Sequence, residues 1–235
     1  TRCPGAPTLP DAMPQLPLSL VPPRRRRFDN FVAGPNAALV EALRHGLREG
    51  QWLFLRGPRG SGKSHLAEAA VHDRHDAGRP TCFVPAGEPG AWALLAGGDA
   101  VLAVVDDVER LAGEADAERA LFNALNRWRA SRTAVLLTGT GSGGFELLDL
   151  VSRLGQAASL TLEPLDDRGL AELIEQLVED FRLVPGRGLG AYLQRHGPRS
   201  PARLVAVFES MARRAHAERR VASVPLAREE LAAAP

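Results

Sequence analysis

The chain has 235 residues, of which 45% are hydrophobic and 24% are charged, enough for one sizeable core or for a core domain with a small second domain. Its formal net charge of +1 gives no global electrostatic reason to expect a nucleic-acid or membrane surface, so any contact with DNA is expected to be indirect or weak. Two distant cysteines and the lack of a long apolar stretch argue against a disulfide framework, a zinc site and a membrane span, and they predict a cytoplasmic protein.

The N-terminal segment differs in composition from the rest of the chain. Residues 1–23 contain seven prolines and little apolar periodicity, which predicts an extended or disordered arm rather than packed structure. The run from Arg24 to Arg27 is expected to be a solvated hinge. The arm is therefore assigned to residues 1–27.

The following residues are predicted to alternate between helices and strands. Residues 36–48 have helical spacing, with Asn36 as the cap and Gly50 ending the element. Five short apolar runs are expected to be strands: Trp52 to Leu55, Thr81 to Val84, Val101 to Val105, Ala134 to Leu137 and Ser159 to Leu162. Helical segments are expected at about 63–77, 90–96, 116–130 and 145–153. This βαβ rhythm predicts an α/β fold with a five-stranded parallel sheet in a core domain of residues 28–164.

The pattern changes after Pro164. Three helical segments without strands are expected at about 167–182, 187–196 and 201–220. They predict a small helical lid domain over residues 165–235.

A phosphate-loop pattern lies between the first expected strand and the helix after it. Its residues are Gly57, Pro58, Arg59, Gly60, Ser61, Gly62, Lys63 and Ser64. Glycines let backbone N–H groups turn toward an anion, and the helix adds its positive N-terminus. Lys63, the only lysine among 29 basic residues, is expected to neutralise phosphate oxygens, and Ser64 to bind Mg²⁺. The alternative is a plain glycine turn, which the flanking strand and helix disfavour.

The apolar strand that begins at Val101 ends in two carboxylates. Asp106 is expected to act on the magnesium side of the site, and Asp107 to polarise an attacking water, although its side chain is one methylene shorter than that of a glutamate. Taken alone, such a pair is commonly a helix cap or a turn. Its position at a strand end after a phosphate loop favours the functional interpretation.

These motifs together resemble the AAA+ core of the DnaA/Hda family of replication proteins. The matching segments are Phe28 to Val32, Gly57 to Leu66 with its Gly-Lys-Ser-His-Leu ending, Asp106-Asp107, and Leu150 to Leu154. The resemblance covers residues 28 to about 220. The chain stops at Pro235, after the helical lid, without the helix-turn-helix domain of the initiator, and this favours the regulators of the Hda group.

The resemblance assigns further residues to the nucleotide site. Phe28 and Phe31 would line an adenine pocket, with His65 beside the phosphate loop, although aromatic residues at a domain edge are often simply core. Thr140 follows the fourth strand, where a polar side chain can sense the γ-phosphate. The family usually has Asp there, and the departure puts the chain's own ATP hydrolysis in doubt.

Two arginines match positions that act on phosphates in this family. Arg153 matches the arginine finger, which reaches the nucleotide of a neighbouring subunit. Arg203 resembles the nucleotide-sensing arginine of the lid, in the first turn of a helix with Ser200 as its N-cap and Pro201 as its first residue. A solvated surface role is the alternative for both residues.

The arm contains a short motif of its own. Gln15, Leu16, Leu18 and Leu20 match the hexapeptide by which Hda-type and other replication proteins dock on the sliding clamp, the β subunit of DNA polymerase III. An extended segment can lay leucines into an apolar groove while glutamine supplies directional hydrogen bonds.

The resemblance thus implies an ATP- or ADP-binding regulator with Mg²⁺, which binds the clamp and promotes hydrolysis of DnaA-bound ATP. It further implies AAA+ surfaces suited to self-association, and a place on the bacterial nucleoid through the clamp. The alternatives are a helicase loader of the DnaC type, which shares the Gly-Lys-Ser-His-Leu phrase, and a small-molecule P-loop kinase, which would need an acceptor pocket.

Overall fold

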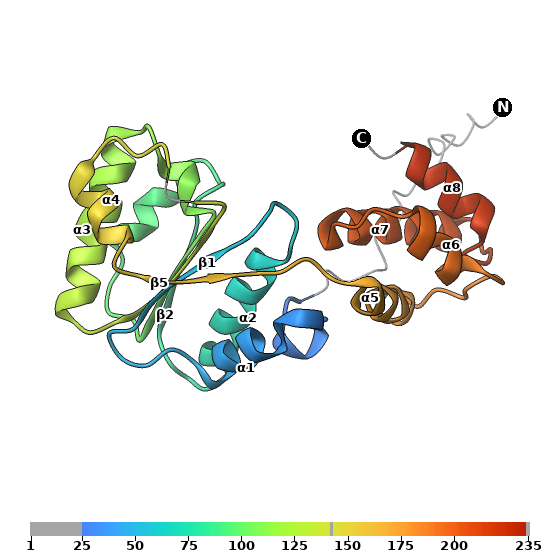
Figure 1. Ribbon diagram of the computed structural model, residues 1–235, viewed down its shortest axis with the longest axis horizontal. Helices are drawn as coiled ribbons and strands as arrows, with labels where there is room; N and C mark the ends of the chain where they lie inside the picture. The colour runs from blue at the N-terminus through green and yellow to red at the C-terminus, as the bar shows by residue number, and fades with distance from the viewer. Residues whose placement is uncertain (1–24, 142, 234–235) are drawn as a thin grey trace, which may run out of the picture.

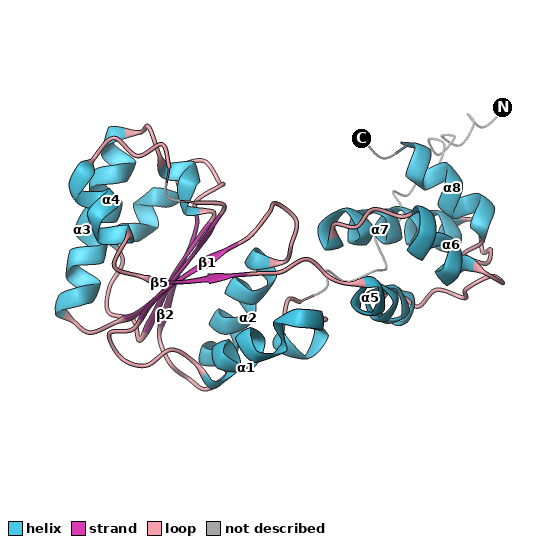
Figure 2. Cartoon of the chain, in the orientation of Figure 1, coloured by secondary structure: helices cyan, strands magenta, loops and turns pink. Residues whose placement is uncertain are grey.

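The computed structural model describes residues 25–141 and 143–233. A twisted sheet flanked by helices forms one part of the molecule, and a group of helices forms the other (Figures 1 and 2). The arm positions Gln15, Leu16, Leu18 and Leu20 lie outside the described residues.

The five predicted strands are confirmed, with ends shifted by one or two residues. They are β1 (Trp52–Arg56), β2 (Thr81–Pro85), β3 (Leu102–Asp106), β4 (Ala134–Gly139) and β5 (Ala158–Thr161). All neighbouring strands are parallel, in the order β2-β3-β4-β1-β5. β3 and β4 are buried throughout, whereas all four residues of the edge strand β5 are exposed.

Helices connect the strands, as the sequence predicts. The α-helices of this part are α1 (Ala37–His45), α2 (Lys63–Asp76), α3 (Ala115–Ala130) and α4 (Leu148–Leu154), and the 3-10 helices are η1 (Phe28–Asn30), η2 (Gly34–Asn36), η3 (Ala91–Ala96) and η4 (Val108–Leu111). The segment expected to be helical at 90–96 is thus the 3-10 helix η3. α1 was predicted to extend to residue 48 and to end before Gly50, but it ends at His45. Gly46 is its C-cap residue, and its φ of +84° does not continue the helix.

Asn36 stands at the N-cap position of α1, but its side chain does not cap the helix as expected. Its Nδ2 donates to the carbonyl oxygen of Glu163 at 2.9 Å, and its Oδ1 accepts from the Glu163 amide at 2.8 Å. The amide side chain therefore fastens the start of α1 to the segment that leaves β5. A bond across 127 positions of sequence cannot be predicted from local spacing.

Alternating side chains of β1 fill two apolar cores. Trp52 and Phe54 face α3 and α4, while Leu53 and Leu55 pack with residues of α1 and α2. Both faces of the sheet are therefore covered, as a parallel sheet requires. Figure 1 shows α1 and α2 on one side of the strands and α3 and α4 on the other.

Four helices after the sheet enclose a further apolar core. They are α5 (Asp167–Asp180), α6 (Leu189–His196), α7 (Pro201–Ala217) and α8 (Val224–Ala233). The prediction of three helices here missed α8, although Leu226 is fully buried. Within residues 25–141 and 143–233, no helix combines the length and apolar character that a membrane span requires.

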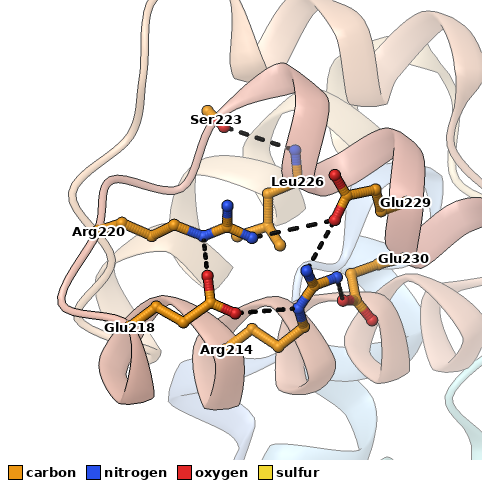
Figure 3. A network of polar contacts seen from close by, with 7 residues as sticks. All are labelled: Arg214, Glu218, Arg220, Ser223, Leu226, Glu229 and Glu230. Atoms are coloured by element: carbon orange, nitrogen blue, oxygen red, sulfur yellow. Dashed lines mark hydrogen bonds and ion pairs between the residues drawn. The ribbon is translucent and has the colours of Figure 1, made fainter.

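Ion pairs join α7 to α8 (Figure 3). Arg214 donates to Oε1 of Glu230 and to Oε2 of Glu229, each at 2.7 Å, and Arg220 pairs with Glu218 at 2.7 Å. Hydrogen bonds to Glu230 and Glu229 raise the pKa of Arg214. Since Glu230 is only 8% exposed, Arg214 supplies the charge that this buried carboxylate needs.

Candidate functional site

The predicted phosphate loop connects β1 to α2 at the carboxyl edge of the sheet. Gly60 and Gly62 have φ values of +75° and +106°, which side-chain-bearing residues rarely adopt. α2 begins at Lys63, and no side chain caps it. A loop of this shape brings backbone N–H groups and a helix N-terminus to one place, which is the arrangement that binds phosphate.

Lys63 is buried inside this loop. Its side chain is 4% exposed, and Nζ donates to the carbonyl oxygens of Gly57 and Pro58, each at 3.0 Å. The Oγ of Ser61 is buried as well and has no hydrogen-bond partner. A buried ammonium and an unpartnered hydroxyl in a glycine loop fit an anionic ligand, because such a ligand would give both groups a charged or polar partner.

The two acidic residues at the end of β3 are contacted by a residue that the sequence analysis did not select, through the carboxylate of Asp106 and the backbone of Asp107. The hydroxyl of Thr138, on the neighbouring strand β4, donates to Oδ1 of Asp106 and accepts from the Asp107 amide. Thr138 is fully buried and Asp106 nearly so. Thr138 lies two residues before Thr140 at the end of the same predicted strand, which was the only signal for it in the sequence. Its bond to Asp106 follows from the pairing of β3 with β4, which the sequence does not specify.

Asp107 has a backbone and a pKa that set it apart from ordinary aspartates. It adopts a left-handed φ of +52°, which turns the chain sharply at the end of β3. Burial raises the pKa of its carboxyl, and the charges of Asp106 and Glu109 add to the effect against the opposing charges of Lys63 and Arg110. A carboxylate with a raised pKa accepts a proton more readily, as a general base must.

Thr140, predicted to sense a phosphate, is bound to Glu109. The Thr140 amide and hydroxyl both donate to Oε1 of Glu109, at 3.0 and 2.9 Å, while Oε2 of Glu109 is buried without a partner. Since the hydroxyl hydrogen is used in this way, only its lone pairs remain for another group. The sequence analysis missed Glu109. Its position two residues after Asp107, as a third acidic residue at the same strand end, could have identified it.

Ser64 and Asp106 remain the predicted magnesium ligands. Ser64 lies in the first turn of α2 and Asp106 at the end of β3. In the part of the chain that the structure describes, no group of three or more His, Cys, Asp or Glu side chains is arranged to hold a metal ion. The two predicted ligands suit Mg²⁺, since this ion commonly takes one or two protein ligands and fills its shell with phosphates and water.

The predicted adenine-pocket residues have different surroundings. Phe28 is 6% exposed and packs in the core beside α2, whereas the Phe31 ring lies against Gly62, where an added Cβ would approach its Cε2 to 2.8 Å. The rings of Phe31 and His65 meet edge to face at 5.2 Å, and His65 bonds the carbonyl oxygen of Arg27 at 2.8 Å. Phe31 and His65 therefore adjoin the phosphate loop, while Phe28 is a core residue.

Arg153 lies in the last turn of α4, and Figure 1 shows this helix on the side of the sheet opposite α2, the helix that follows the phosphate loop. Its side chain is partly exposed, and among the described residues it has no hydrogen-bond or ion-pair partner. An arginine so placed is available to a second molecule.

A buried carboxylate holds the loop that leads into α4. Glu118, 2% exposed, accepts hydrogen bonds from the backbone amides of Gly113, Glu146 and Leu147. Burial would raise the pKa of this carboxyl, but the three amides outweigh it and leave the pKa lowered. Glu118 thereby fixes the entry to the helix that carries Arg153.

The lid reaches the phosphate loop through the start of α7. Ser200 and Pro201 are its N-cap and first residue, as predicted, but the Ser200 hydroxyl does not cap the helix. It donates instead to the carbonyl oxygen of Gly60 at 3.3 Å, and the Ala202 amide donates to the same oxygen at 3.2 Å. Arg203, exposed in this first turn, is thus next to a residue that touches the loop.

We expect Glu118→Ala to lower the free energy of unfolding by about 2 to 4 kcal/mol, because three backbone donors lose a charged acceptor. Since the pKa of Glu118 is lowered on folding, its contribution is complete above the unfolded pKa and is lost as the pH falls through the folded one. Urea unfolding at neutral and acid pH measures both effects. The control is Glu114→Ala, an exposed glutamate before α3 without a capping bond, and equal losses in the two variants would contradict the assignment.

Comparisons with known proteins identify the fold. No protein-family model matches the sequence. The structure is similar to domain III of the replication initiator DnaA from Thermotoga maritima, with 17% identity, a TM-score of 0.75, and coverage of 91% of this chain and 98% of that one. AMPPCP-bound DnaA from Aquifex aeolicus matches with 20% identity and a TM-score of 0.65, over 85% of this chain and 71% of that one. The Holliday junction branch migration motor RuvB of Thermotoga maritima matches with 17% identity and a TM-score of 0.64, over 92% and 73%. The chain therefore has the AAA+ fold, a five-stranded parallel sheet followed by C-terminal helices.

Proposed function

We propose that this chain binds ATP or ADP with Mg²⁺ in the loop between β1 and α2, and that it regulates the initiation of DNA replication. The observation that carries the nucleotide site is the buried Lys63 ammonium inside a glycine loop, beside the paired carboxylates of β3. The similarity of fold to DnaA, which one solved structure holds bound to AMPPCP, supports the same proposal.

The side chains around the loop divide the work of binding. Lys63 exchanges two loop carbonyls for phosphate oxygens, and Ser64 and Asp106 hold the magnesium side. The rings of Phe31 and His65 border the loop beside Gly62. Nucleoside triphosphate supplies a phosphoanhydride bond whose hydrolysis is strongly favourable. Asp107, at the turn directly after Asp106, is the residue proposed to accept a proton from water.

The chain's own hydrolysis is proposed to be slow. Thr140 occupies the position where the family that this chain resembles usually has Asp. Its hydroxyl donates a hydrogen bond to the carboxylate of Glu109. It cannot donate a hydrogen to a phosphate oxygen while it donates to that carboxylate. A regulator that binds nucleotide as a switch needs no rapid turnover.

Arg153 is proposed to act on a second protein. Its side chain has no partner among the described residues of its own chain, and its helix, α4, lies on the side of the sheet opposite α2 (Figure 1). An arginine finger supplied across an interface places a planar charge on phosphate oxygens as negative charge develops there. We propose that its target is ATP held by DnaA, whose hydrolysis would limit further initiation.

The arm is proposed to bring the chain to the sliding clamp through Gln15, Leu16, Leu18 and Leu20. These residues lie outside the described part of the chain, so the proposal rests on their match to the hexapeptide. Clamp binding would raise the concentration of this chain near DNA-bound DnaA. A helicase loader is the competing function, and pull-down with purified clamp, helicase and DnaA separates the two.

Lys63→Ala is expected to weaken the binding of both ADP and ATP tens-fold, since the loss of a charge-assisted phosphate contact costs on the order of 2 kcal/mol. Isothermal calorimetry measures the two affinities. Arg79→Ala, in an exposed turn after α2, serves as the control and should bind like the wild type. Unchanged affinity of the Lys63 variant would show that the loop does not bind nucleotide in this way.

We expect the Arg153→Ala variant to keep nearly normal affinity for its own nucleotide. It should no longer stimulate DnaA to hydrolyse the ATP that DnaA holds, because the arginine acts across an interface. A reconstituted assay with DnaA, clamp and DNA measures the stimulation, and Arg119→Ala on the exposed side of α3 is the matched control. If the variant loses its own nucleotide binding but each bound complex still stimulates DnaA normally, Arg153 is not an arginine finger.

Replacing Gln15 and Leu16 together by Ala should weaken clamp binding a hundredfold or more. A leucine buried in a groove contributes roughly 1.5 to 3 kcal/mol and a directional hydrogen bond about 1 kcal/mol. Surface plasmon resonance on immobilised clamp gives the affinity, and replacing Thr8 and Leu9 in the same arm is the control. Equal affinities for wild type and the Gln15-Leu16 variant would remove the clamp from the proposal.

A further inference from the structure

The tip of the phosphate loop is held by the lid. The carbonyl oxygen of Gly60 accepts hydrogen bonds from the Ser200 hydroxyl at 3.3 Å and from the Ala202 amide at 3.2 Å. We call these two bonds the loop–lid contact. The bond from Ser200 joins positions 140 residues apart, and in Figure 1 the loop between β1 and α2 extends toward the start of α7.

The loop–lid contact leaves no room for a side chain at position 60. A Cβ added to Gly60 would lie 2.3 Å from the Ser200 Oγ and 3.2 Å from the Ala202 Cβ, and the φ of +75° disfavours any side chain. The absence of a side chain at Gly60 therefore allows the lid to approach the backbone of the loop directly.

Fixing this carbonyl fixes the next amide. In a planar trans peptide the C=O and the following N–H point in opposite directions, so a Gly60 oxygen turned to the lid turns the Ser61 N–H into the loop. There the Ser61 amide donates a hydrogen bond to the Pro58 carbonyl oxygen at 3.3 Å. The carbonyls of Gly57 and Pro58 are oriented by Lys63, and the lid orients that of Gly60.

The use of the Ser200 hydroxyl supports a role beyond packing. An N-cap serine commonly accepts a hydrogen bond from an amide of its own first turn, which stabilises the helix. Ser200 makes no such bond and donates to the loop instead. The hydroxyl thus contributes to the geometry of the loop, not to capping of α7.

We propose that Ser200 is a positioning residue of the nucleotide site: through the loop–lid contact, the lid holds the phosphate loop in its binding shape and sets the affinity for phosphates. This inference rests on the proposed nucleotide binding. It assigns to the lid a second action on the site, separate from any contact that Arg203 makes.

A disulfide across the contact tests the inference directly. The Cβ positions of residues 60 and 200 lie 3.7 Å apart, within the range of about 3.5 to 4.5 Å that disulfides require. The double variant Gly60→Cys and Ser200→Cys is made with Cys3→Ser and Cys82→Ser, so that no other thiol competes. Cross-link yield is measured by mass spectrometry, and affinity for fluorescent ADP and ATP is measured before and after oxidation.

The expected result is a high yield of cross-link without nucleotide and at least tenfold tighter nucleotide binding by the oxidised form than by the reduced form. Because a side chain at Gly60 is strained, failure to cross-link counts against the contact when the reduced double variant keeps the wild-type unfolding midpoint, and the Ser200 variants described below decide when it does not. Weaker binding after oxidation would make the contact inhibitory, and equal binding would make it irrelevant to affinity, so each result overturns the proposal. A wild type that binds neither nucleotide would reject the proposed function as well, whereas the other failures reject only the role of the lid.

Single substitutions provide an independent measurement. Ser200→Ala should weaken nucleotide binding about threefold to tenfold with an unchanged unfolding midpoint, and Ser200→Thr, which keeps the hydroxyl, should restore it. Ser223→Ala, at the start of α8, is the control. Gly60→Ala should weaken binding far more than Gly78→Ala, since Gly78 has a similar φ of +69° but no atom within 4 Å of an added Cβ. The proposal would be contradicted if Ser200→Ala and Ser223→Ala changed nucleotide affinity equally, or if Gly60→Ala and Gly78→Ala did.

Discussion

Parallel pairing of β3, β4 and β1 brings three strand ends, far apart in sequence, to one edge of the sheet. The phosphate loop leaves β1 there, and Asp106 ends β3 there. Thr138 on β4 connects the two acidic residues by bonding the side chain of one and the backbone of the other. Each feature of the candidate site depends on this pairing, because no local segment contains both the loop and the carboxylates.

Charge at this edge is balanced by very few groups. Lys63 is buried among carbonyl oxygens, and Asp106, Asp107 and Glu109 gather beside it. Burial raises the pKa of Asp107, and the negative charges of Asp106 and Glu109 raise it further. A divalent cation would relieve it, which is the electrostatic reason that a nucleotide with Mg²⁺ suits the site better than a nucleotide alone.

The sequence predicted the parts of this molecule that are encoded locally. Each strand is a short apolar run, and the loop residues from Gly57 to Ser64 stand together, so periodicity and spacing locate them. Asn36, Glu118 and Ser200 could not be interpreted correctly in the same way. Each of them bonds the backbone of a residue at least 28 positions away, and a backbone group gives no signal in the sequence. α8 escaped because its alanines and charges give no clear apolar stripe, although the lid core encloses it.

The clasp between Asn36 and Glu163 has a mechanical consequence. Both backbone hydrogen-bonding groups of Glu163 are bound by one side-chain amide, so the chain remains anchored to the core for two positions beyond β5. α5 begins at Asp167, where the Asp166 carboxylate accepts from the Gly169 amide. The chain segment that links the anchored end of the sheet to the lid is thereby reduced to the few backbone torsions between Glu163 and Asp166. One of those residues is Pro164, whose ring fixes its own φ. A link this short and partly rigid limits the positions that Ser200 can take relative to the phosphate loop, so the length of the segment after β5 contributes to the loop–lid contact.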